Sequence, residues 1–196
     1  CTKAETKSKV KAFIQMIHHY RDFYLNGTEV KNGKIVPIEG YFLSHTDKSY
    51  IPTEHVAIFD EAQRAWTKEE LARFMKEKKS IKDFPYSEPE YLMSCMDRQT
   101  DWGLVVCLIG GGQEINKGEA GISEWIASLN RSFSDWHVYM SNMLTEKEYA
   151  DGKALELLDM DNSQIHVEQS LHLSVSMRSF RAEKVSMFVH QLLNLQ

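Results

Sequence analysis

Two short runs of apolar residues, 56–59 and 104–109, constrain the fold of this chain most strongly. Continuous apolar runs of this length are typical of strands in parallel sheets, because helices cover both faces of such sheets. Helical patterns follow these runs: one begins near Thr67, and others cover residues 90–98 and 119–129. The alternation of strand and helix patterns predicts an α/β fold with a largely parallel sheet flanked by helices.

Further elements are predicted towards both ends of the chain. Apolar residues at helical spacing predict an amphipathic helix over about residues 3–25, and Asn26-Gly27 is expected to end it. Residues 136–140 are expected to form a strand, and residues 165–175 one or two more. The last helix is expected to carry its apolar side chains on one face, at Val185, Phe188, Val189, Leu192 and Leu193.

Two neighbouring carboxylates, Asp60 and Glu61, follow the first apolar run directly. Ligands of open α/β sheets bind beyond the carboxyl ends of the strands, so these acids are predicted at the ligand edge. An aspartate there can hold a magnesium ion on nucleotide phosphates, and Glu61 is placed to orient or deprotonate an attacking water. The alternative is a strand that simply ends in an acidic turn.

Three glycines and a glutamine follow the second apolar run: Gly110, Gly111, Gly112 and Gln113. Glycines after a strand let the backbone approach a phosphate closely, because no side chain stands in the way. The Gln113 amide can donate to a terminal phosphate or accept from the attacking water. The alternative is a flexible loop with an incidental glutamine.

Composition excludes several classes of protein. The formal net charge is −5, so the chain as a whole is not a basic nucleic-acid-binding protein. The longest apolar run is too short to cross a bilayer, and no membrane association is expected. The three cysteines show no zinc-binding spacing, and reduced thiols in a cytoplasmic protein are predicted.

The order of these elements resembles superfamily 1 helicases. Asp60 to Gln63 reads Asp-Glu-Ala-Gln, which is similar to motif II of that superfamily, and Gly110 to Gln113 is similar to motif III. Motif III commonly has an acid where this chain has Gly111. Arg178 is similar in position to the motif IV arginine that contacts nucleotide phosphate from a second RecA-like domain, and Arg181 is the rival candidate.

The longer strings FDEAQRAW and GGGQEINKGEAGISEW resemble the Schlafen-group-3-like DNA/RNA helicase domain, a family of conserved ATPases of unknown function. The resemblance covers roughly residues 50–195, and its second string is the more specific. It implies a RecA-like P-loop NTPase core that binds ATP and Mg²⁺. It also implies a nucleic-acid partner, DNA or RNA, on the strength of the fold.

The resemblance assigns a role to each candidate residue. Asp60 is expected to hold magnesium, and Glu61 to activate water. Gln113 is expected to sense the terminal phosphate, with Gly110, Gly111 and Gly112 beside it, and Gln63 to lie near the phosphates. Arg178 is expected to complete the site across a cleft between two domains.

A phosphate-binding loop of the form G-x-x-x-x-G-K-[ST] is absent from the sequence. The expected organisation is therefore incomplete: residues 1–160 form a partial first RecA-like domain, and residues 161–196 begin a second. The chain is read as an interior piece of a longer ATPase, and the alternative is an ATPase that has decayed into a scaffold. Alone, the chain is expected to show negligible turnover, because that loop supplies much of the binding of ATP. The competing class is a noncatalytic module that binds a protein or a nucleic acid.

Overall fold

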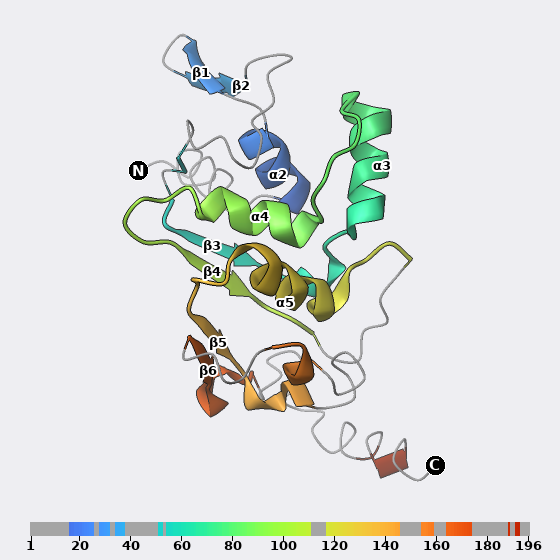
Figure 1. The fold of residues 1–196 in the computed structure, drawn as a ribbon, viewed down its shortest axis with the longest axis vertical. Helices are drawn as coiled ribbons and strands as arrows, with labels where there is room; N and C mark the ends of the chain where they lie inside the picture. The colour runs from blue at the N-terminus through green and yellow to red at the C-terminus, as the bar shows by residue number, and fades with distance from the viewer. Residues whose placement is uncertain are drawn as a thin grey trace.

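The computed structural model describes residues 16–25, 28–31, 34–37, 51–52, 54–110, 117–145, 154–158, 164–173, 188 and 191–192. The described part contains helices beside short parallel strand pairs (Figure 1), and this confirms the α/β class. The helices are α2 (Ile17–Leu25), α3 (Lys68–Lys79), α4 (Glu88–Met96) and α5 (Gly121–Ser132). The strands are β1 (Thr28–Lys31), β2 (Lys34–Pro37), β3 (Val56–Phe59), β4 (Leu104–Cys107), β5 (Val138–Met140) and β6 (Ile165–Val167).

The strands form three separate two-stranded sheets in the described residues. β3 pairs with β4 and β5 pairs with β6, both in parallel, whereas β1 and β2 form an antiparallel pair. The prediction of parallel pairing is confirmed for the two apolar runs. The prediction of one largely parallel sheet is confirmed only in part, because no described strand joins the β3–β4 pair to the β5–β6 pair.

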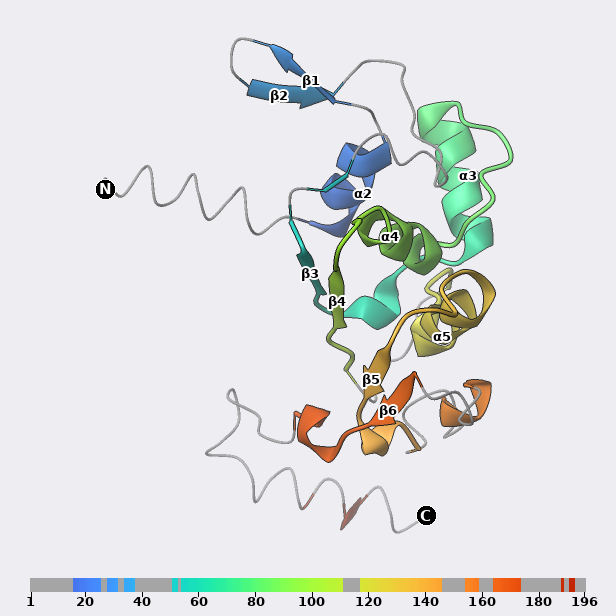
Figure 2. The same ribbon diagram turned by 60° about the vertical axis from the view of Figure 1, so that its left-hand side comes forward.

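The main core lies on one side of β3 and β4. Ala57 and Phe59 of β3 pack there against Leu92, Met93 and Met96 of α4 and against Trp125 of α5. Figure 2 shows α2, α4 and α5 on this same side of the two strands. This arrangement buries alternate residues of β3 and leaves the others outside the core.

The opposite side of β3 and β4 is open in the described part of the chain, and here the expected burial was wrong. Val56, Ile58 and Leu104 are 43%, 61% and 48% exposed. Their apolar character predicts cover on both faces of the pair. The described helices cover one face only, so an apolar surface remains on the other.

Helix α3 begins where its sequence predicts. The Thr67 hydroxyl accepts a hydrogen bond from the backbone N–H of Glu70 at 3.3 Å, which satisfies one of the free donors of the first turn. Ser87 does the same for α4, with a hydrogen bond from the Glu90 N–H at 3.3 Å. The predicted helix at 90–98 therefore begins two residues earlier, at Glu88.

A buried ion pair joins α2 to α4. The Arg21 guanidinium donates to Glu88 Oε1 at 2.8 Å, and both side chains are almost fully buried. The Arg21 guanidinium also lies over the rings of Trp66 and Phe74, at 5.3 and 4.7 Å from their centres. Glu88 uses its second oxygen to accept from the Trp66 backbone N–H at 2.9 Å. One carboxylate thus fixes both α2 and the segment that follows β3.

The Cys95 thiol is expected to resist alkylation in the folded chain. Burial raises its pKa to about 12 from the usual 9.0, so almost no thiolate forms at neutral pH. Because the folded-state pKa is the higher one, the stabilising contribution of this thiol is complete below pH 9 and declines as the pH rises towards 12. Iodoacetamide labelling near pH 8 of a Cys1→Ser variant, followed by mass spectrometry, should modify Cys95 only after denaturant is added. Rapid labelling of Cys95 in native buffer would contradict this.

Candidate functional site

The two candidate acids lie at the carboxyl end of β3, beside the exit of β4. Phe59 and Cys107, the last residues of the two strands, are partners in the parallel register. The pairing continues beyond them, because the Leu108 N–H donates to the Phe59 carbonyl at 2.9 Å. Asp60 is exposed and Glu61 is half-buried. The acids and the start of the glycine-containing loop thus meet at one edge of the sheet.

Glu61 has a left-handed backbone, with φ 52° and ψ 42°. A residue with a side chain pays of order 1 kcal/mol or more for this conformation, and such strain is concentrated at functional sites. The Glu61 N–H donates to Asp60 Oδ1 at 3.0 Å, so the Asp60 carboxylate stabilises the backbone turn at Glu61. The turn leads the chain from β3 directly into a short 3-10 helix, Ala62–Arg64.

The Gln63 side chain connects the acidic turn to the residues after β4. Its Nε2 donates to Glu61 Oε2 at 2.7 Å, and its Oε1 accepts from the Gly110 N–H at 3.4 Å. Gln63 is only 4% exposed, so water competes little for these bonds. The backbone adds a parallel link, since the Ala62 N–H donates to the Leu108 carbonyl at 3.0 Å.

Residues that were not predicted as site residues hold the 3-10 helix in place. The buried Trp125 of α5 donates from its Nε1 to the Ala62 carbonyl at 2.7 Å. Glu88 holds the backbone at Trp66, four residues later than Ala62. Trp125 is 4% exposed and lies in the main core. Its hydrogen bond and the role of Glu88 were missed, because neither follows from sequence spacing.

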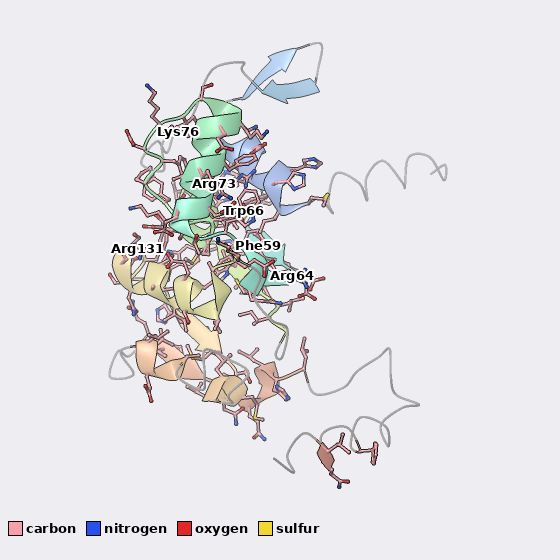
Figure 3. All side chains as sticks on the ribbon, turned by 90° about the vertical axis from the view of Figure 1, so that its right-hand side faces the viewer. Phe59, Arg64, Trp66, Arg73, Lys76 and Arg131 are labelled. Atoms are coloured by element: carbon pink, nitrogen blue, oxygen red, sulfur yellow. The ribbon has the colours of Figure 1, made fainter. Side chains whose placement is uncertain are left out.

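One cation lies close to the candidate acids. Arg64 Nε is 3.6 Å from Glu61 Oε2, and both side chains are partly exposed. Figure 3 shows Phe59, Arg64 and Trp66 grouped where β3 leads into the 3-10 helix. Arg64 therefore offsets part of the negative charge on Glu61, although solvent weakens the interaction.

Several predicted site residues lie outside the described residues. These are Gly111, Gly112, Gln113 and Arg178, together with the rival Arg181. Their roles stay predictions, as does the placement of the Gln113 amide beside Asp60 and Glu61. Among the described residues, no group of three or more histidine, cysteine, aspartate or glutamate side chains is arranged to hold a metal ion. The predicted magnesium role of Asp60 thus stays untested.

A hollow of about 530 Å³ lies away from these acids, between the start of α3 and one face of α5. Neither Asp60 nor Glu61 lines it. Its lining is Thr67, Lys68, Glu69, Pro85, Glu90, Ala120, Ser123, Glu124, Ala127, Arg131 and Leu157.

None of the helices in the described residues is both long and apolar enough to span a membrane.

Comparison with known proteins bears on the whole chain. The family described as "Schlafen group 3, DNA/RNA helicase domain" matches residues 2–196. A search of curated proteins and a search of solved structures each gave no match. The family match extends through the acidic turn and the loop after β4. The chain belongs to the Schlafen group 3 DNA/RNA helicase domain family.

Proposed function

We propose that this chain is the part of a RecA-like, nucleic-acid-dependent ATPase that activates water and senses nucleotide. The observation that carries the proposal is the Gln63 bridge between the Glu61 carboxylate and the Gly110 N–H. A buried amide in this position makes the acidic turn and the start of the glycine loop move together. The family described as a DNA/RNA helicase domain supports the nucleic-acid partner.

The donor chemistry of the acidic turn fits a nucleotide-bound magnesium ion. Mg²⁺ keeps several waters and takes one or two carboxylates, and an exposed Asp60 at the strand end can supply one. Bound there, the ion would neutralise charge on the ATP phosphates. Glu61 is held at its Oε2 by Gln63, and its carboxylate can take a proton from the attacking water.

The remaining roles extend the same proposal. Gln113 would contact the terminal phosphate of a bound nucleotide, and the Gly110–Gln63 hydrogen bond would link that contact to Glu61. Arg178 supplies a planar charged donor from the second domain. The domain boundary near residue 160 belongs to the proposal as well. β6, which follows this boundary, pairs with β5, so the two proposed parts are in contact there.

ATP binding also requires a phosphate-cradling loop, and residues 1–196 contain no sequence of that form. These residues alone are therefore expected to turn over ATP negligibly. The proposal is best tested on the full-length natural protein.

In the full-length protein, Mg²⁺ is expected to raise the affinity for ATP. Asp60→Asn is expected to reduce this gain in affinity about tenfold or more, because the neutral amide is a poor magnesium ligand. Titration of a fluorescent ATP analogue with and without Mg²⁺ measures this gain. Asp101→Asn is the matched control, since Asp101 is an exposed acid before β4, at the opposite end of the strand pair. An undiminished magnesium effect in Asp60→Asn would remove Asp60 from the site.

A noncatalytic interaction module is the second candidate, and the open apolar side of β3 and β4 favours it. Val56, Ile58 and Leu104 present contiguous apolar surface there, and such surfaces commonly mark interaction sites. The same titration separates the two functions. A full-length protein that binds nucleic acid but no nucleotide would support the module and exclude the ATPase.

A further inference from the structure

Trp125 contacts the chain on both sides of the acidic turn. Its ring packs against that of Phe59, the residue before Asp60, with the ring centres 5.7 Å apart. Its indole N–H donates at 2.7 Å to the carbonyl of Ala62, the residue after Glu61. One buried side chain therefore holds both residues that flank the two acids.

Helix α5, which carries Trp125, is itself fixed to the segment that follows the acids. The Ala120 N–H, directly before this helix, donates to the Ala65 carbonyl at 2.7 Å. The Gly118 carbonyl accepts from the Thr67 N–H at 2.9 Å. Because these bonds restrain the start of α5 relative to the turn, the indole N–H is a well-fixed donor.

The turn requires support at Ala62. The left-handed backbone of Glu61 is unfavourable for a residue with a side chain, and such conformations persist only where their surroundings enforce them. Ala62 is fully buried, and its N–H is bonded to the Leu108 carbonyl at 3.0 Å. Its carbonyl accepts from Trp125 at 2.7 Å and from the Ala65 N–H at 3.2 Å, so the tryptophan supplies the shorter of the two bonds.

We propose that Trp125 is a positioning residue for the carboxylate of Glu61, an inference that rests on the proposed role of Glu61 as general base. Trp125 acts through the backbone of Ala62, next to the base in the chain. A general base must lie within hydrogen-bonding reach of the water that it deprotonates, and a small misplacement lowers the rate strongly. Loss of the indole N–H is therefore expected to lower kcat more than the affinity for nucleotide.

Trp125→Phe in the full-length natural protein tests this role, because phenylalanine keeps an aromatic ring and loses the donor. The kcat for ATP hydrolysis is expected to fall about tenfold or more, with the KM for ATP changed less than about twofold. Trp136→Phe is the matched control. Trp136 packs against the same core and donates from its Nε1 to Asp97 Oδ1 at 3.0 Å, so the control loses an equivalent bond. It is expected to keep the parent kcat.

Hydrogen–deuterium exchange of the same full-length proteins tests the hold on the turn without reference to ATP. The N–H groups of Ala62 and Ala65 are bonded within this segment, so they are expected to exchange faster in Trp125→Phe than in the parent. In Trp136→Phe their exchange is expected to match the parent. Equal exchange in Trp125→Phe and the parent would overturn the inference.

The hydrolysis rates separate failure of this inference from failure of the proposed function. If Glu61→Gln lowers kcat and Trp125→Phe does not, Trp125 is not a positioning residue, although the proposed function stands. If Glu61→Gln leaves kcat unchanged, the proposed function fails, and the positioning role fails with it.

A second replacement covers the case in which Trp125→Phe does not fold. Benzothienylalanine at position 125 keeps the bicyclic shape of tryptophan, and a sulfur atom takes the place of the indole N–H. The same fall in kcat is expected, because only the donor to Ala62 is lost. A kcat equal to that of the parent would again overturn the role of Trp125.

Discussion

Replacement of Glu61 by glutamine is expected to reduce ATP hydrolysis by the full-length natural protein by about 10²–10⁴-fold, the usual range for loss of a general base. Glutamine has the same shape and can still accept the hydrogen bond from Gln63 Nε2. Because glutamine is similar in size to glutamate, the left-handed turn at position 61 is expected to be retained. What it loses is the ability to take a proton from water, so the rate should fall while nucleotide affinity stays near its original value.

Steady-state release of phosphate, measured together with nucleotide affinity, distinguishes this outcome from unfolding. Glu69→Gln supplies the matched control, since Glu69 is an exposed acid in the first turn of α3 and is expected to leave the rate unchanged. If the full-length protein hydrolyses ATP and Glu61→Gln leaves the rate unchanged, the enzymatic assignment is wrong.

Glu88→Ala is expected to lower the free energy of unfolding by about 3–5 kcal/mol, a larger loss of stability than for any other variant described above. The change removes the buried carboxylate from Arg21 Nη1 and leaves the half-buried Asp22, 3.1 Å from Arg21 Nε, as its remaining carboxylate, and the Trp66 N–H loses its acceptor. Loss of a buried partner is costly because the protein interior solvates the remaining charge poorly. Urea denaturation of the parent and the variant, followed by circular dichroism, measures the difference.

Lys79→Met is the natural comparison for that experiment. Lys79 Nζ lies 2.7 Å from Asp22 Oδ2, so the two ion pairs have similar geometry, but both side chains of this pair are about one quarter exposed. Loss of such a pair is expected to cost less than about 1 kcal/mol. If Glu88→Ala costs no more than Lys79→Met, then Arg21 finds solvent or another partner and the buried pair does not anchor α2.

Local signals explain which parts of the fold could be predicted from the sequence. β3 and α3 are predicted at their observed positions, because an apolar run and a Thr67–Glu70 cap are each encoded within a few residues. The parallel direction of β3 and β4 was also predicted, since two apolar runs in an α/β pattern favour a parallel sheet.

Long-range contacts explain what could not be predicted. The Arg21–Glu88 pair joins residues 67 positions apart, and no spacing rule connects them. The open side of β3 depends on where the helices pack, so apolar composition alone wrongly predicted its burial. The left-handed turn at Glu61 has no glycine or asparagine to indicate it. For Gln113 and Arg178, the roles still rest on family resemblance.

Helix α5 touches both parallel strand pairs at once. Its Trp125 holds the Ala62 carbonyl beside the acidic turn, whereas Ile122 and Ile126 pack with Met140 of β5. Ile122, Trp125 and Ile126 lie at i, i+3 and i+4 on one side of this helix, so they are expected to move together. A displacement of the β5–β6 pair is therefore expected to shift Trp125 and, through its hydrogen bond, the backbone at Ala62 that follows the two acids.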